Sequence, residues 1–205
     1  MIHEESDFGN WVRGIPRLTL GNLAIALFAL QLVALLELML PIQLAPTLEI
    51  ALQGLVAGTV IGFAVRLEEC TLNDIGFQRP TIVDFVYVIG TTVAALLVFA
   101  GTDPFVSALG LPVTDGASAV TAGVGVGLAF VTAVTIGVVE EILYRGYAIE
   151  RLNEYVESPA IAGGISWGTF TIAHAVVWPV GNLIQVATVA AVFTLALLLG
   201  VNPAG

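Results

Sequence analysis

The sequence contains no lysine, one cysteine and few charged residues of any kind. Its 205 residues include 16 acidic and 6 basic side chains, and all 6 basic ones are arginine. Hydrophobic residues make up 58% of the chain and its mean hydropathy is +0.98. This composition excludes a soluble globular domain and a disordered chain. The net charge of -10 argues against nucleic acids and other anionic partners. A single cysteine, Cys70, excludes an internal disulfide and a cysteine-based zinc cluster.

Long apolar runs recur along the chain, each about as long as a helix that crosses a hydrocarbon core of ~30 Å. They predict an all-α, multi-pass transmembrane helical bundle of about six spans, forming a single integral membrane domain over residues 1–205. We expect the polar segment 66–81 and the turn-rich segment 101–116 to be loops or short interfacial helices. The first run is too long for a signal-peptide core, so we expect the amino terminus to be retained. The six runs occupy 18–41, 47–65, 82–100, 118–143, 159–179 and 182–201.

The arginines predict the orientation of the bundle. They occur only in alternate loops, and the intervening loops have none. The positive-inside rule therefore places both termini in the cytoplasm, in a multi-pass protein of the plasma membrane. The lack of lysine and the excess of acids also suggest a salt-adapted prokaryote. The six positions are Arg13, Arg17, Arg66, Arg79, Arg145 and Arg151.

Of the ionisable residues within the apolar runs, where each charge costs several kcal/mol, four are the main ones. They are candidates for function: Glu37 in the first run, Glu140 and Glu141 in the fourth, and His174 in the fifth. If the fourth helix continues toward Tyr155, Glu140 and His174 lie at comparable depths of ~15–20 Å from the cytoplasmic helix ends. We therefore expect the two side chains to face each other.

The spacing of the residues suggests different tasks for the two adjacent glutamates. Glu141 and Arg145 are four residues apart in the favourable order for an ion pair on a helix. Glu140 points about 100° away on a helix and is free to act as a general base toward water. His174 could orient that water, give a proton to a leaving group or bind a metal. Together these groups are the minimum needed to hydrolyse an amide.

Simpler structural roles exist for each of these residues. If their roles are structural, Glu141 and Arg145 form an interfacial ion pair, and His174 and Phe170 are packing residues. Glu37 forms an interhelical hydrogen bond. Glu68 and Glu69, on a loop, are simply solvated.

Two strings resemble the first two motifs, E-E-x-x-x-R and F-x-x-x-H, of the CAAX protease and bacteriocin-processing family. They are EEILYRG, from Glu140 to Gly146, and FTIAH, from Phe170 to His174. The resemblance covers about residues 70–200 and implies a helical intramembrane protease that cleaves a membrane-anchored peptide or protein with an activated water. By position, it implies Glu140 and His174 as catalytic residues. It implies Glu141, Arg145 and Phe170 as supporting residues.

The third motif of that family, H-x-x-x-N on a later helix, has no counterpart here. The only other histidine is His3, and no asparagine follows a histidine at that spacing. We therefore expect the C-terminal helix of the family to be missing and the activity of this chain to be low or absent. Two functions stay open: an endopeptidase, or a non-catalytic protein of the same fold that binds a partner or confers immunity. A bound zinc held in part by Glu140 and His174 and a site with water alone are equally compatible with the sequence. The oligomeric state and the substrate are not specified by it.

Overall fold

The computed structural model describes residues 14–40, 44–114 and 125–200, and every regular element within these ranges is helical. Five helices are long and apolar enough to cross a membrane. A further helix, α8 (Pro159–His174), has 16 residues and takes the place of the expected span 159–179. The predicted all-helical membrane bundle of about six helices is therefore confirmed.

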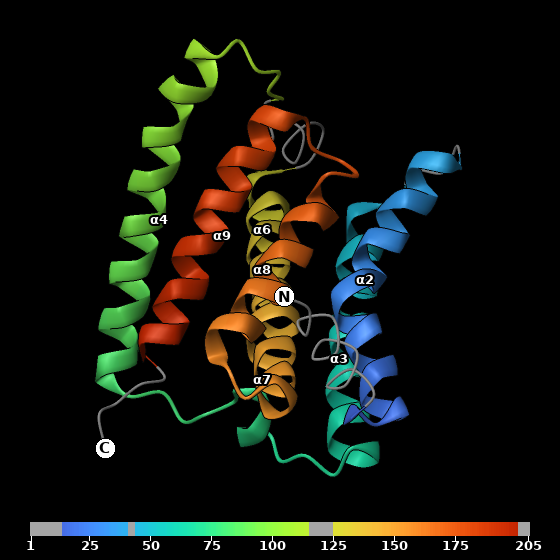
Figure 1. Cartoon of the computed structure of the whole chain (residues 1–205). Helices are drawn as coiled ribbons and strands as arrows, with labels where there is room; N and C mark the ends of the chain where they lie inside the picture. Colours follow the sequence, from blue (N-terminus) through green and yellow to red (C-terminus); the bar gives the residue numbers. More distant parts are fainter. Residues whose placement is uncertain (1–13, 41–43, 115–124, 201–205) are drawn as a thin grey trace, which may run out of the picture.

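Two antiparallel helices, α2 (Arg17–Met39) and α3 (Pro46–Leu67), form one side of the bundle (Figure 1). Each begins at a proline: Pro16 directly precedes α2, and Pro46 is the first residue of α3. Proline suits this place, because the first N–H groups of a helix have no partner within the helix. Small buried residues of α3 allow close packing against the neighbouring helices, namely Ala57, Val60 and Ala64.

The central helix runs without interruption from Val126 to Val156 but changes its winding in the middle. It begins as α6 (Val126–Glu140), continues as the π-helix η2 (Glu141–Ile149) and ends as α7 (Glu150–Val156). The expected continuation of the fourth span toward Tyr155 is thus confirmed. The expected residues 118–124 of that span lie outside the described ranges.

The π-helical segment lies at the centre of the bundle, where four of its side chains are at most 1% exposed: Leu143, Tyr144, Tyr147 and Ala148. A π-helix inserts one residue into the helical repeat, which rotates the side chains that follow and is common at functional sites. The winding change falls directly after Glu140. The amphipathic pattern of the sequence gives no separate signal for it.

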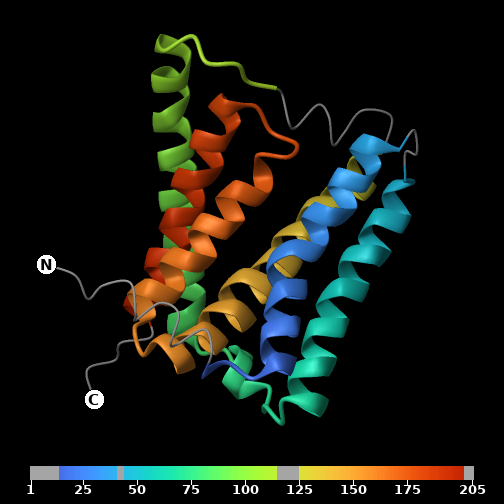
Figure 2. The same cartoon turned by 45° about the vertical axis from the view of Figure 1, so that its right-hand side comes forward.

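On the other side, α8 and α9 (Val180–Gly200) pack together, and α4 (Ile82–Ala108) packs on the outside of α9 (Figure 2). Ser158 accepts a hydrogen bond from the Ile161 N–H and caps α8. Most side chains of α4 are exposed, as expected for a helix that faces lipid. The predicted loop at 101–116 is wrong in its first half, because α4 continues through Pro104 to Ala108. Apolar Phe105 and Val106 extend the hydrophobic stretch there.

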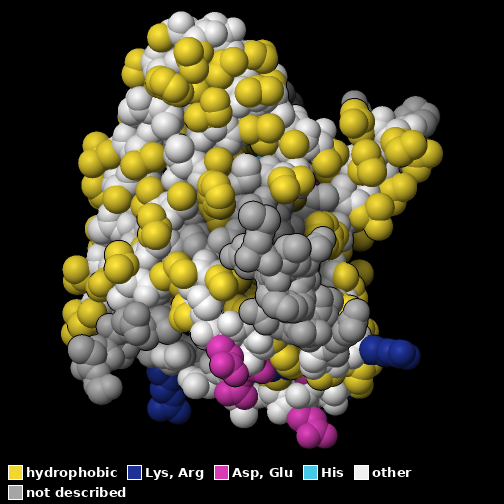
Figure 3. Space-filling model, viewed as in Figure 1, with side chains coloured by type: hydrophobic (Ala, Val, Ile, Leu, Met, Phe, Trp, Pro, Cys, Tyr) yellow, Lys and Arg dark blue, Asp and Glu magenta, His cyan; other side chains and the backbone are white. Residues whose placement is uncertain are grey.

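Charged side chains gather at one end of the bundle, where Figure 3 shows both signs of charge on the face in view. This end holds the start of α2 with Arg17, the end of α3 with Arg66, and the segment before α4 with Arg79. Arg13 and the amino terminus lie outside the described residues. Which side of the membrane this end faces stays a prediction.

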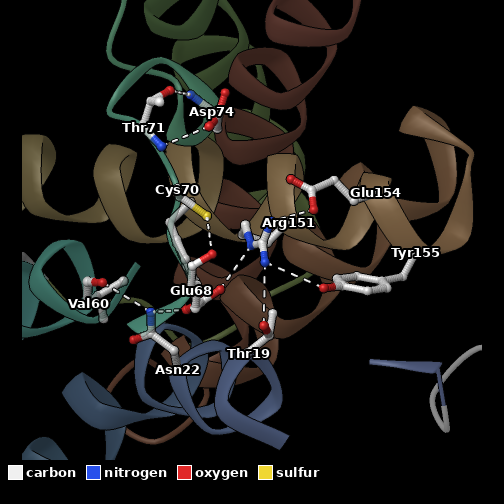
Figure 4. A network of polar contacts seen from close by, with 11 residues as sticks. Thr19, Asn22, Val60, Glu68, Cys70, Thr71, Asp74, Arg151, Glu154 and Tyr155 are labelled. Carbon is white, nitrogen blue, oxygen red and sulfur yellow. Dashed lines mark hydrogen bonds and ion pairs between the residues drawn. The ribbon is translucent and has the colours of Figure 1, made fainter. Parts of the chain in front are cut away.

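A buried polar network fixes the same end, and it corrects the prediction that Glu68 is a solvated loop residue (Figure 4). The Glu68 side chain is 2% exposed and accepts a hydrogen bond from Arg151 Nε at 3.0 Å. It also accepts hydrogen bonds from Asn22 Nδ2 at 2.6 Å and from the Tyr147 hydroxyl at 2.7 Å. Arg151 is paired in addition with Glu154. One carboxylate therefore joins α2, the end of α3, η2 and α7.

A close backbone contact places the polar segment 68–81 against the π-helix. Gly76 has a φ of +85°, and a Cβ added to it would lie 3.1 Å from the Cα of Gly146. A Cβ added to Gly146 would lie 3.1 Å from the Ile75 carbonyl oxygen. Both glycines are needed for this approach, because a methyl group on either one would press on backbone atoms. Gly146 is the last residue of the EEILYRG string.

Candidate active site

Glu140 and His174 face each other at the middle of the bundle. His174 Nε2 lies 3.5 Å from Glu140 Oε1, and the two side chains are 17% and 22% exposed. Glu140 is the last residue of α6, and His174 is the last residue of α8. The sequence placed them at similar depth on different helices, and the structure brings them together as expected.

The tautomer of His174 follows from its hydrogen bond to the backbone. His174 Nδ1 lies 2.8 Å from the Phe170 carbonyl oxygen, and a carbonyl oxygen only accepts, so Nδ1 carries a hydrogen. Nε2 is then the nitrogen that faces Glu140. Carboxylate oxygens accept and an imidazole nitrogen can donate or accept, so the pair can hold one proton between carboxylate and imidazole. Such a pair can take a proton from one molecule and give one to another.

Arg145 forms the predicted ion pair with Glu141, its Nη1 lying 2.7 Å from Glu141 Oε1. The two partners differ in burial, with 7% of the Arg145 side chain exposed against 48% of the Glu141 side chain. Arg145 also donates to the Ala190 carbonyl at 3.5 Å. Its guanidinium carbon lies 5.0 Å from the ring centre of Phe170 and 5.7 Å from that of Phe193. Arg145 therefore joins η2 to both α8 and α9.

Phe170 is buried and connects Arg145 with the histidine. Its ring centre lies 4.3 Å from that of His174, one helical turn further along α8. The ring also receives an edge-to-face contact from Tyr144 at 4.9 Å. Phe170 is a packing residue, as one interpretation of the sequence has it. It packs against His174 of the second motif and Arg145 of the first motif.

Tyr144 belongs to the same arrangement, and sequence reasoning missed it. Its side chain is 1% exposed, and its hydroxyl donates to the Leu27 carbonyl at 3.1 Å and contacts the Gln31 side chain. The Ser166 hydroxyl donates to the Tyr144 carbonyl at 2.6 Å. Tyr144 thus ties the π-helix to α2 and α8. Its place inside the EEILYRG string was the one available signal.

A cavity of about 490 Å³ begins one turn beyond the histidine. The Trp178 N–H donates to the His174 carbonyl at 2.9 Å, and Val177 and Trp178 form one wall of the cavity. Glu37 also lines the cavity. Glu37 Oε1 is buried and has no partner among the described residues, and the interhelical hydrogen bond of Glu37 stays a prediction.

The residues do not fit a usual catalytic zinc site. Glu140 and His174 supply two ligands, and a catalytic zinc commonly takes three from the protein. Within the ranges that the structure describes, no group of three His, Cys, Asp or Glu side chains could hold a metal ion. The chemistry available from these described residues is therefore that of a carboxylate, an imidazole and water.

Residues 122–202 match a family model described as type II CAAX prenyl endopeptidase Rce1-like. The matched segment, two fifths of the chain, holds both motifs from Glu140 to His174. No curated protein and no solved structure matches the chain. The resemblance seen in the two motifs is thus confirmed at the level of the family.

Proposed function

We propose that this chain is an intramembrane endopeptidase of the CAAX-processing type, in which Glu140 and His174 activate water to cleave a membrane-anchored peptide. The observation that carries the proposal is the 3.5 Å approach of the Glu140 carboxylate to His174 Nε2 across two helices. Ionisable side chains are costly at this depth. Two of them that meet, each from a motif of a matched protease family, favour a catalytic function.

The proposed reaction needs one proton held between the two side chains. Glu140 accepts a proton from water while the water oxygen bonds to the scissile carbonyl carbon, and negative charge moves to the carbonyl oxygen. The carbon–nitrogen bond then breaks, and His174 gives the proton on Nε2 to the leaving nitrogen. The proton on Glu140 passes to His174, which restores the starting pair. The products are a carboxylic acid and an amine.

The surrounding residues would hold this pair in position. The Phe170 carbonyl fixes His174 Nδ1, and the Phe170 ring packs against the imidazole. Arg145, held by Glu141, also packs against that ring. Positioning of this kind matters because a displacement of about 1 Å can cost about 10²-fold in rate.

The rate is expected to be low. Only Glu140 and His174 are assigned to the reaction, and the lack of one donor for the developing oxyanion commonly costs 10²–10³ in rate, by order of magnitude. A sensitive end-point assay is therefore required. Detergent-purified chain is incubated with a prenylated CAAX peptide and with an unprenylated membrane-anchored peptide, and the products are identified by mass spectrometry.

The test compares wild type with Glu140→Gln, His174→Ala and Glu157→Gln. Glu157 is an exposed glutamate just after α7, so its replacement is the matched control. Cleavage by wild type and by Glu157→Gln, with none by the other two, supports the proposal. Cleavage that persists in Glu140→Gln shows that another group is the general base.

A second candidate function is a non-catalytic membrane protein that keeps the fold and binds a partner. The observation that favours it is that the described part of the site offers two chemical groups and no third. In that case Glu140→Gln would retain the binding of the partner and its biological effect. The endopeptidase proposal requires that effect to be lost.

A further inference from the structure

The cavity next to the turn that follows His174 lies toward the end of the bundle opposite Arg17, Arg66 and Arg79. Its walls come from the last turns of α2, the first turns of α3 and the turn between α8 and α9. Thr114 closes one edge and is fixed there by Asn182, whose Oδ1 accepts from the Thr114 N–H at 2.8 Å and whose Nδ2 donates to its carbonyl at 3.2 Å. Thr114 is therefore held in place in the lining of the cavity.

This cavity is lined by residues with buried hydrogen-bond acceptors to which no described residue donates. Glu37 and Glu49 both line it, together with Gln53. Glu37 Oε1 and Gln53 Oε1 are buried and have no hydrogen-bond partner among the described residues. Buried polar atoms without partners are rare, because each costs about 1–3 kcal/mol. No described residue of the lining is basic.

The other walls suit an alkyl chain. Leu30, Val33, Leu52 and Val56 provide aliphatic surface, and Trp178 provides an aromatic ring. Basic side chains bury their methylene stems against such surfaces while the charged head seeks polar partners. Aromatic rings also attract cations. A bare metal ion fits less well, because a volume of about 490 Å³ is far larger than such an ion needs.

We propose that this cavity binds an arginine or lysine side chain of the peptide substrate, with Glu37, Glu49 and Gln53 accepting hydrogen bonds from its cationic head. The inference rests on the proposed function, since it assigns the cavity to the substrate of the Glu140–His174 site. The side chain would enter one helical turn from His174, so it would belong to a residue near the scissile bond.

A binding measurement tests the subsite without any need for cleavage. Labelled propylguanidinium, the arginine side chain without its backbone, is titrated into the purified full chain, and propylurea is the neutral control of nearly the same shape. We expect propylguanidinium to bind at least about tenfold more tightly, as charge-assisted hydrogen bonds are stronger than neutral ones. Glu37→Gln together with Glu49→Gln should remove this preference. Equal binding of both compounds, or a preference that survives the double substitution, overturns the proposal.

Two further variants keep the test decisive if the double variant fails to fold. Ala34→Lys retains both carboxylates and places an internal ammonium in the cavity, so it should block propylguanidinium. Glu140→Gln should bind propylguanidinium as wild type does while cleaving nothing. Unchanged binding in Ala34→Lys, or lost binding in Glu140→Gln, contradicts the assignment.

A cleavage measurement separates this inference from the proposed function. Peptides with arginine or norleucine near the scissile bond are compared, and wild type should prefer arginine by at least about tenfold in kcat/KM. The double variant should lose that preference by cleaving the arginine peptide with a lower kcat/KM. Cleavage without any arginine preference refutes the subsite alone. Binding without cleavage refutes the endopeptidase alone.

Discussion

The guanidinium of Arg145 lies 5.0 Å from the ring centre of Phe170, and the same ring lies 4.3 Å from that of His174. This contact joins Arg145 of the first motif, on the π-helix, to Phe170 and His174 of the second motif, on α8. Phe170 is thus placed to hold the imidazole, and it needs no chemical group of its own to affect the reaction.

Phe170→Leu is expected to reduce kcat/KM about tenfold or more while changing the free energy of unfolding by less than about 1.5 kcal/mol, because it largely conserves apolar volume. It removes the contacts of the aromatic ring with His174, Arg145 and Tyr144. Phe193→Leu is the matched control, since Phe193 also faces Arg145 but lies on α9. Cleavage kinetics and thermal unfolding measure the two effects. An equal loss of activity in both variants would show that only the support of Arg145 matters.

Glu68→Ala is expected to destabilise the protein by about 2–4 kcal/mol, because it leaves Arg151 without one of its two carboxylate partners and removes the acceptor for Asn22 and Tyr147. Thermal unfolding in detergent measures this. Glu69→Ala is the control, because Glu69 is the adjacent acid and is exposed. We expect it to stay within about 0.5 kcal/mol of wild type. Similar melting temperatures for the two variants would be inconsistent with the buried network.

The topology is tested in a Cys70→Ser background with single cysteines at the two ends of α4. Gln78→Cys should react with an impermeant thiol reagent only from the cytoplasmic side, and Ser107→Cys only from outside. Both positions are exposed. The prediction follows from the one-sided arginines. Labelling of position 78 from outside in intact cells would show that the protein has the opposite orientation.

Burial raises the pKa of the Cys70 thiol above its ordinary value. Its thiolate fraction at pH 7 should therefore be smaller than that of Gln78→Cys, and maleimide should modify it more slowly. The unfolded chain loses this proton at lower pH than the folded chain, so the thiol's contribution to stability falls as the pH rises from the unfolded pKa through the folded pKa. Labelling rates between pH 6 and pH 10 measure the shift. Equal rates at positions 70 and 78 would contradict it.

The meeting of Glu140 and His174 was predictable because each lies on a recognisable span and their depths follow from helix rise alone. The ion pair of Glu141 and Arg145 was predictable for a similar reason, since both lie on one helix, four residues apart. Local spacing and depth are properties that a sequence displays directly.

The role of Glu68 was not predictable, because its partners Asn22, Tyr147 and Arg151 lie 46 to 83 residues away. Two adjacent glutamates on a loop carry no sign of which one is buried. The π-helix and the Gly76–Gly146 contact depend likewise on tertiary packing. The early end of α8 at His174 was also missed, because the apolar residues up to Trp178 continue the hydrophobic pattern through a turn.

The central claim is that Glu140 and His174 act as one unit, and a double-mutant cycle on kcat/KM tests it most directly. Wild type, Glu140→Gln, His174→Ala and the double variant are assayed on one membrane-anchored peptide. Each single change should lower kcat/KM by about 10³ or more, and the double variant should be no more than about threefold worse than either, as expected for residues that share a step. Independent losses that multiply in the double variant, or a single variant that keeps most of the activity, would contradict the account.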